Sequence, residues 1–178
     1  MSPACTAPLI RSSSRGRFIA FEPVLINCGI IFRMIRLNYI EFDTNGKNEI
    51  VDITDHIRQL VNQSGLSNGS VLVFVPGATG GLSTIEYEPG LVKDLPRLMD
   101  KLIPERDHYF HNETWHDGNG HSHLRATLIG PSLTIPFEDK RLILGTWQQV
   151  VFLEFDNKPH QRRIAVQLTG ERSATAAY

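Results

Sequence analysis

The chain contains little cysteine and almost no net charge, and each shortage excludes a class of protein. Its two cysteines, Cys5 and Cys28, form no Cys-x-x-Cys pair, which argues against a disulfide framework and a zinc finger and indicates a reducing cytoplasm. The formal charge of -1 at pH 7 arises from interspersed acidic and basic residues. We therefore expect no basic surface for nucleic acid or for an anionic membrane.

Long apolar runs are also missing from the sequence. The most apolar stretch, residues 18–32, is too short to span a bilayer, and Glu22, Pro23 and Asn27 interrupt it. No clear small-residue cleavage site follows, so the stretch does not match a secretory signal peptide.

The 178 residues suffice for a single domain, which we place at residues 34–178. Residues 1–33 form an extension rich in serine and arginine, with Glu22 as its only acid. Met34 opens a strand-like segment, so a translation start at Met34 would make the extension part of an over-long reading frame. An extra strand and a disordered tail are the alternatives.

Several segments have the composition of strands. Residues 35–42 are rich in β-branched and aromatic side chains, and the Asn45-Gly46 turn predicts a hairpin with residues 49–51. Residues 70–75 form an apolar run typical of a strand buried on both faces. The later strands are expected at residues 133–137, 141–155 and 162–168.

Helical spacing occurs in three places: after Thr54, between Pro89 and Pro104, and after Asn119, where Thr54 and Asn119 can act as caps. Pro96 would kink the second helix or divide it in two. The apolar stripes expected to face the core are Ile57, Leu60 and Val61; Leu95, Leu98, Met99, Leu102 and Ile103; and Leu124, Leu128 and Ile129.

A glycine-rich loop, residues 77–81, follows the strand predicted at residues 70–75. Glycine lets backbone N–H groups approach an anion closely, but the loop lacks the Lys-Ser/Thr ending of a P-loop and the spacing of a dinucleotide fingerprint. We favour close backbone packing as its purpose.

Histidine is concentrated in one segment: five of the seven histidines lie between residues 108 and 123, together with Glu113, Asp117 and Asn119. Imidazole ligates zinc and titrates near neutral pH, so the segment predicts a metal site or an acid–base site. The carboxylates also suit a hard cation bound through oxygen, and the metal identity stays open. The alternative is a set of surface histidines and satisfied core histidines.

Helix geometry limits which histidines can act together. Positions two apart in a helix point about 200° from each other, so His121 and His123 should have separate tasks if both are helical. His111 would then come from a preceding strand or loop. In the strand predicted at residues 141–155, alternation places Thr146 and Gln148 on one face, either as hydrogen-bond donors to a substrate or on an exposed sheet face.

Four blocks of the sequence together resemble the YjbQ-like family, also called secondary thiamine-phosphate synthase enzymes. They are STIEYEPGLVKDL (residues 83–95), DGNGHSHLRA (117–126), GPSLTIP (130–136) and LGTWQ (144–148). The similarity runs from about residue 34 to residue 171 and leaves the extension uncovered.

The resemblance implies an α+β fold with a β-sandwich-like core and a few short helices, in a homotrimer with a metal or anion site near the subunit interface. It also implies a weak transferase activity that joins a hydroxymethylpyrimidine diphosphate to a thiazole phosphate. The positions that carry over from the family motifs are His111, His123, Ser132, Thr146 and Gln148.

The chain departs from the family at one important place. Many members carry His-Thr-Ser/Thr-Ala, followed by an Asn-Glu-Asn run, where this chain has Gly77-Ala78-Thr79-Gly80 and Glu86-Tyr87-Glu88. His121 could supply the missing imidazole, and Glu86 a carboxylate.

Two functions therefore compete. In a transferase, a divalent metal on His111, His121 and His123 and the charge of Arg125 would stabilise the departing pyrophosphate. Glu86 and Asp117 would serve as catalytic carboxylates, and the substrate would contact Ser132, Thr146, Gln148 and Asn119. The alternative is a non-catalytic homotrimer that binds a metal ion or a small anion through its histidines.

Overall fold

The computed structural model describes residues 34–172, so predictions about residues 1–33 lie outside the described part of the chain. The elements in chain order are β1 (Met34–Thr44), β2 (Ile50–Asp52), α1 (Thr54–Gln63), β3 (Asn68–Phe74), β4 (Gly80–Ile85), α2 (Leu91–Leu102), α3 (Phe110–Trp115), α4 (Gly120–Ile129), β5 (Ser132–Glu138), β6 (Arg141–Leu142), β7 (Gln149–Glu154) and β8 (His160–Glu171).

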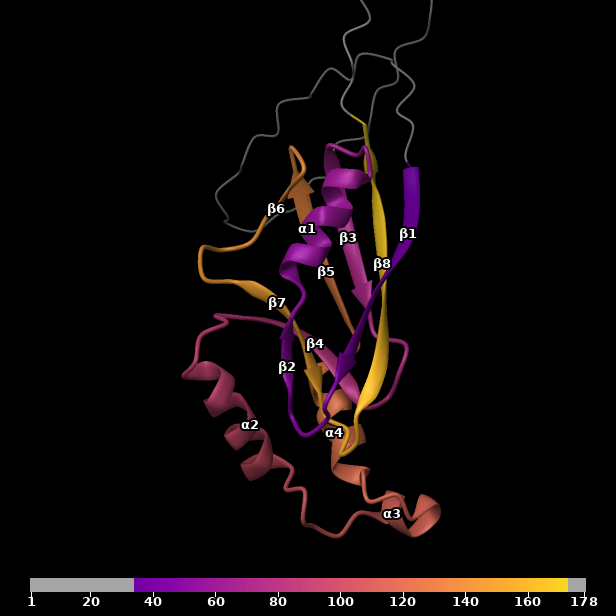
Figure 1. The fold of residues 1–178 in the computed structure, drawn as a ribbon, viewed down its shortest axis with the longest axis vertical. Coiled ribbons are helices and arrows are strands. Elements are labelled where there is room, and N and C mark those ends of the chain that lie inside the picture. Colours follow the sequence, from indigo (N-terminus) through magenta and orange to yellow (C-terminus); the bar gives the residue numbers. More distant parts are fainter. Residues whose placement is uncertain (1–33, 173–178) are drawn as a thin grey trace, which may run out of the picture. The chain divides into compact units, whose positions relative to one another are not determined.

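The strands form two antiparallel sheets (Figure 1). The larger has the order β1-β8-β3-β5-β6, and the smaller has the order β2-β7-β4. The longest pairing joins β1 to β8 from Met34 opposite Gly170 to Thr44 opposite His160. Antiparallel sheets combined with a few helices confirm the predicted α+β class.

The main hydrophobic core lies between the two sheets. Alternate residues of the larger sheet, such as Val71 and Ile164, face Val150 and Phe152 of β7, and all four are essentially inaccessible to solvent. Helix α1 adds the predicted residues Ile57 and Val61 to this core, and partly buried Leu60 packs against it. Each fully buried side chain of this kind contributes about 1.5–3 kcal/mol of transfer free energy.

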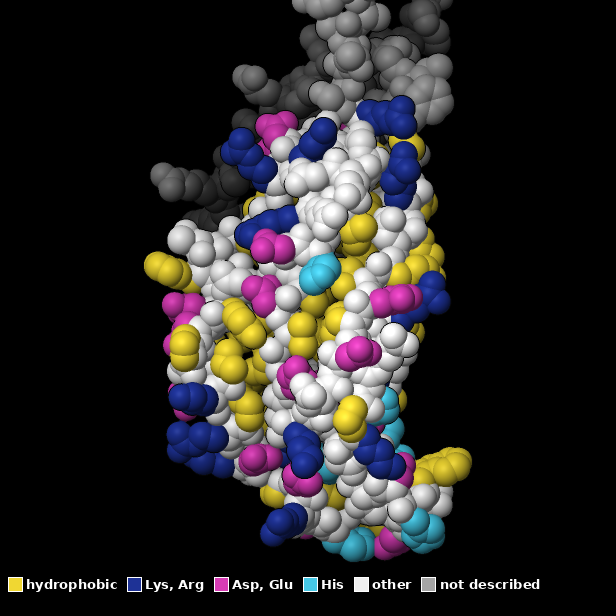
Figure 2. Space-filling view, viewed as in Figure 1, with side chains coloured by type: hydrophobic (Ala, Val, Ile, Leu, Met, Phe, Trp, Pro, Cys, Tyr) yellow, Lys and Arg dark blue, Asp and Glu magenta, His cyan; other side chains and the backbone are white. Residues whose placement is uncertain are grey.

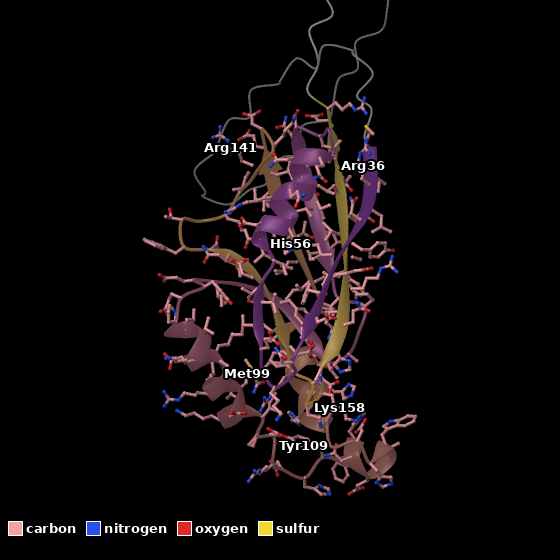
Figure 3. The ribbon with its side chains drawn as sticks, in the orientation of Figure 1. Arg36, His56, Met99, Tyr109, Arg141 and Lys158 are labelled. Carbon is pink, nitrogen blue, oxygen red and sulfur yellow. The ribbon has the colours of Figure 1, made fainter. Side chains whose placement is uncertain are left out.

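A second core covers the other face of the smaller sheet. Val151, Leu153 and Phe155 pack there against Met99 of α2 and Ala126 of α4. Figure 3 shows Met99 pointing from α2 toward the strands. Strand β7 is therefore covered on both faces, which explains why nearly every residue in it is buried.

Two of the strand predictions need correction. The Asn45-Gly46 turn does not make a hairpin, because β1 belongs to the larger sheet and β2 to the smaller one. Strand β3 is also covered on only one face, since Leu72 is half-buried and Phe74 is exposed.

The strand predicted at residues 141–155 is broken. It divides into β6 and β7, and the intervening loop folds back so that the Gln148 N–H donates to the Gly145 carbonyl at 3.0 Å. Thr146 and Gln148 therefore do not alternate along a strand, and the shared strand face that we predicted for them is wrong.

The three predicted helices form where expected, but some side chains predicted to face the core are exposed. α2 is one helix with Pro96 inside it, and Leu98 and Leu102 of its predicted stripe are exposed. On α4, Leu124 and Leu128 are exposed, while His121, Ser122, Arg125 and Ala126 are buried. α4 thus turns small and polar side chains toward the protein.

Candidate functional site

Two short helices bring His111 and His123 together. His111 lies on α3, not on the strand or loop that we predicted, and His123 lies on α4. The chain reverses between the helices through left-handed residues, His116 with φ 55° and Gly118 with φ 69°. The centroids of the two imidazole rings are 4.2 Å apart, and both residues are half-buried.

Asp117 and Asn119 complete this group, which we call the histidine cluster: His111, His123, Asp117 and Asn119. The Oδ1 atom of Asp117 lies 3.6 Å from Nε2 of His111. When the Asn119 amide nitrogen faces Asp117, it donates to the two carboxylate oxygens at 3.0 and 3.1 Å and lies 3.2 Å from His111 Nε2. Asn119 does not cap α4 with its side chain; Asn112 Oδ1 accepts the N–H of Gly120 instead.

Figure 2 shows histidines gathered at the end of the molecule where α3 and α4 lie. The β7–β8 turn, whose Lys158 is labelled in Figure 3, lies at the same end. In that turn, Nδ2 of Asn157 donates to the Asp117 carbonyl at 3.3 Å. The histidine cluster is therefore supported by the sheets as well as by its two helices.

His121 and His123 lie in different surroundings, as the helix geometry predicts: His121 is buried, whereas His123 is half-buried beside His111. His121 is 3% exposed, and its Nε2 lies 3.3 Å from the Ser122 hydroxyl, which itself donates to the Phe155 carbonyl. Burial lowers the pKa of His121, and the charge of Arg125 lowers it further. His121 thus packs α4 on the smaller sheet as a neutral imidazole.

The residues between 34 and 172 include no three histidine, cysteine or carboxylate side chains already arranged to hold one metal ion. In the histidine cluster the Asn119 amide contacts both the Asp117 carboxylate and His111 Nε2, so a metal ion would have to replace these contacts.

A pocket of about 270 Å³ opens beside His123. Its walls are the glycine-rich loop, the neighbouring turn of α4 and Pro131; the lining residues are Gly77, Ala78, Gly80, His123, Ala126, Thr127 and Pro131. A larger hollow of about 380 Å³ lies between the ends of β3 and β8, but no histidine lines it. We take the smaller pocket as the candidate ligand site because it adjoins the histidine cluster.

The glycine-rich loop is held in place from two sides. The Thr79 carbonyl accepts the N–H of Phe155 at 2.9 Å, and the Thr79 hydroxyl accepts a hydrogen bond from Arg162 Nη2 at 2.9 Å. A Cβ on Gly80 would lie 2.5 Å from the Phe152 ring, so glycine is required there for close packing. This supports packing as a main reason for the glycines, as we favoured.

Sequence analysis missed the group that anchors this loop, which we call the Glu154 cluster: Glu154, Arg162, Thr44 and Thr79. Glu154 is fully buried, accepts from Arg162 Nε at 2.6 Å and accepts from the Thr44 hydroxyl at 2.7 Å. The available signal was the alternation of β7, which places Glu154 in line with the core residues Val150 and Phe152.

Asp156 and His160 lie next to the Glu154 cluster, with Oδ2 of Asp156 3.0 Å from Nε2 of His160. Burial by itself would raise the pKa of Asp156, but hydrogen bonds with His160 and Thr79 lower it overall. This carboxylate therefore stays ionised and strengthens the β7–β8 turn.

The buried Arg125 side chain is held by internal hydrogen bonds. It is 1% exposed and donates to Asn48 Oδ1 at 2.6 Å, to Asp100 Oδ1 at 2.7 Å and to the Ile103 carbonyl. The predicted contact between Arg125 and a departing pyrophosphate would require these bonds to break.

The remaining predicted residues lie outside the pocket lining. Glu86 and Ser132 are exposed, and Thr146 and Gln148 lie in the exposed loop before β7. Gln148 Oε1 accepts the N–H of Gly145 at 2.8 Å. Within one chain, these four residues are not brought to the histidine cluster.

Known proteins share both the sequence and the fold. Residues 38–171 match the family model described as UPF0047 protein YjbQ-like. The chain belongs to this YjbQ-like family. A UPF0047 protein of Archaeoglobus fulgidus is 43% identical over 119 residues, which cover 67% of this chain and 90% of that protein. The UPF0047 protein YugU of Bacillus subtilis is 31% identical over 138 residues, covering 75% and 99% of the two chains.

The YjbQ-like fold is also seen in solved structures. A crystal structure of a YbjQ-like protein of unknown function from Sulfolobus solfataricus P2 has a TM-score of 0.75 and 33% identity, and it covers 79% of this chain and 100% of the other. Within residues 34–172 of the YjbQ-like chain, every helix is too short or too polar to cross a bilayer.

Proposed function

We propose that the protein binds a divalent metal ion through His111 and His123 and a small phosphorylated molecule in the adjoining pocket. The observation that carries this proposal is the pairing of two half-buried imidazoles from different helices, with ring centroids 4.2 Å apart, one of which, His123, lines a pocket. Imidazole pairs suit zinc and its neighbours in the transition series, and a nearby carboxylate widens the choice.

The residues present fit such an ion. Asp117 lies 3.6 Å from His111 Nε2, so a rotation of its side chain would add a carboxylate to the two imidazoles. Three protein groups with one open position form the arrangement that zinc uses in catalytic sites. A bound cation would also give the pocket a positive charge, which favours an anionic ligand.

We further propose that the protein assembles as a homotrimer. The outer face of the larger sheet exposes large apolar side chains, with Ile35 at 68%, Leu37 at 56%, Tyr39 at 44% and Phe74 at 42% exposure. Several exposed large apolar side chains on one sheet face are typical of an interface. Because Phe74 lies three residues before Gly77, a neighbouring copy on this face would reach the rim of the pocket.

The second candidate function is the transferase that the resemblance implies, which joins a pyrimidine diphosphate to a thiazole phosphate with loss of pyrophosphate. The pocket beside a metal-binding histidine pair favours it, because a cation there would stabilise the leaving group. The pocket's size of about 270 Å³ favours the binding function, since it suits one small ligand better than two. Formation of thiamine phosphate, with and without chelator, separates the two.

The metal proposal is tested with the double variant His111→Ala/His123→Ala. We expect it to lose bound zinc, measured by elemental mass spectrometry after dialysis, while keeping its melting temperature, because neither ring is in the core. The matched control is His56→Ala/His108→Ala, which removes two exposed histidines outside the histidine cluster and should retain zinc. Equal zinc contents in the two double variants would contradict the proposal.

A further inference from the structure

Gly77 is the one residue of the pocket whose lack of a side chain has no packing reason. Its φ lies outside the left-handed region, unlike that of Gly118. A Cβ at Gly77 would lie 3.6 Å from Nη1 of Arg162 and 3.9 Å from Cγ1 of Val75, which are ordinary van der Waals contacts. Alanine would therefore fit at residue 77, whereas at Gly80 it would collide with Phe152.

The space left open at Gly77 borders a free hydrogen-bond donor. Nε of Arg162 donates to Glu154, and Nη2 donates to Glu154 and to the Thr79 hydroxyl at 2.9 Å. Among residues 34–172, the structure gives Nη1 no hydrogen-bond partner. The side chain is 12% exposed and Nη1 is not one of the buried atoms without a partner, so Nη1 is a solvent-accessible donor on a fixed guanidinium.

We infer that Gly77 and Arg162 Nη1 form an oxyanion subsite, which takes a phosphoryl oxygen of the ligand in the pocket beside His123. This inference deepens the proposed function, because it names the end of the pocket that recognises the phosphate. A guanidinium N–H donating to an anionic oxygen forms a strong, short bond. Glu154 and Thr79 already hold the guanidinium, so binding costs little side-chain entropy.

The charges around the subsite explain why phosphate binding needs both Arg162 and the metal ion. The carboxylate of Glu154 compensates the positive charge of Arg162, so Nη1 supplies direction and hydrogen bonding more than net attraction. The attraction would come from a metal ion on His111 and His123, of which His123 lines the same pocket as Gly77. Phosphate should therefore bind more tightly when zinc is present.

The test uses inorganic phosphate as the probe and the full chain, titrated by calorimetry with and without zinc. A methyl group at residue 77 would occupy the place of the phosphoryl oxygen, so Gly77→Ala should weaken phosphate binding about tenfold or more, the loss expected for a hydrogen bond to a charged group. Gln161→Ala, which changes the exposed neighbour of Arg162 on the other face of β8, is the control and should bind phosphate normally.

A second variant removes the donor without leaving a buried charge unpaired. Glu154→Gln/Arg162→Gln should fold, because both members of the ion pair become neutral together, and it should lose phosphate binding while keeping zinc. Unchanged phosphate affinity in Gly77→Ala would overturn the inference, as would a wild-type protein that binds zinc but no phosphate. If phosphate binding responds to Gly77→Ala but is no tighter in the presence of zinc, the subsite stands and the proposed contribution of the metal ion to anion binding is overturned.

Discussion

The Glu154 cluster and the histidine cluster are both polar, yet they differ in burial and in closeness of contact. Glu154 is fully buried, and its hydrogen bonds with Arg162 Nε and the Thr44 hydroxyl are 2.6 and 2.7 Å long. In the histidine cluster, the His111 side chain is 30% exposed and its Nε2 lies 3.6 Å from Asp117.

This difference indicates that the Glu154 cluster stabilises the fold and that the histidine cluster is accessible to a ligand. A buried ion pair whose members are fully hydrogen-bonded is rigid, and removal of one member leaves an uncompensated charge. A half-exposed cluster with longer contacts can rearrange around an ion at little cost in stability. The first group should therefore control folding, and the second should control binding.

The largest expected effect tests the structural side of this comparison. Glu154→Ala leaves Arg162 mostly buried without its carboxylate, and we expect a loss of about 3–5 kcal/mol in the free energy of unfolding, measured with urea. The control is Glu41→Ala, which removes an exposed ion pair with Arg163 and should cost about 1 kcal/mol or less. A similar loss in both variants would break the comparison.

A smaller effect should come from the pH dependence of His121, the buried histidine of α4. The folded pKa of His121 is lowered, mainly by burial, so the unfolded chain binds a proton near the ordinary value of 6.5 while the folded chain stays neutral. The contribution of neutral His121 is thus complete above about pH 6.5 and is lost as pH falls toward the folded pKa.

This pH dependence is measured from urea midpoints between about pH 7.5 and pH 5.5 in the wild type and in His121→Gln. The variant should show a shallower fall in stability toward acid, whereas the exposed-site control His56→Gln should follow the wild type. Parallel curves for His121→Gln and the wild type would show that His121 is not an acid-sensitive part of the fold.

The smallest effect concerns the loop before β7. Gln148 is exposed and bonds mainly within its own loop, so Gln148→Ala should change the free energy of unfolding by less than about 1 kcal/mol. If Gln148 contacts the ligand from a neighbouring copy, as its predicted substrate role requires, calorimetry should show weaker phosphate binding by this variant. A large loss of stability with normal binding would remove this residue from the site.

Much of the local structure could be predicted because it depends on neighbouring residues alone. The spacing of Ile57, Leu60 and Val61 predicted α1, and β-branched runs predicted β3, β5 and β8. The histidine density predicted a site within residues 108–123, and within that segment the structure places His111, Asp117, Asn119 and His123 close together.

Predictions failed where a distant partner decided which face is covered, and where a local turn or the short helix α3 was not recognised. Leu124 and Leu128 have helical spacing, but whether that face is covered depends on where α4 packs, and the structure turns His121 and Ser122 inward. Thr146 and Gln148 seemed to alternate because the fold-back at Gly145 was not recognised.

By itself, the sequence determined where α1, α2, α4 and most strands form and which segment carries the imidazoles, because side-chain periodicity and turn residues act over a few positions. Only the tertiary structure decided that β1 and β2 enter different sheets, that Thr44 and Arg162 meet Glu154, and that Nη1 of Arg162 faces Gly77. These contacts join residues far apart in the chain, and their free energy depends on burial and on charge pairing that exist only once the two sheets have packed.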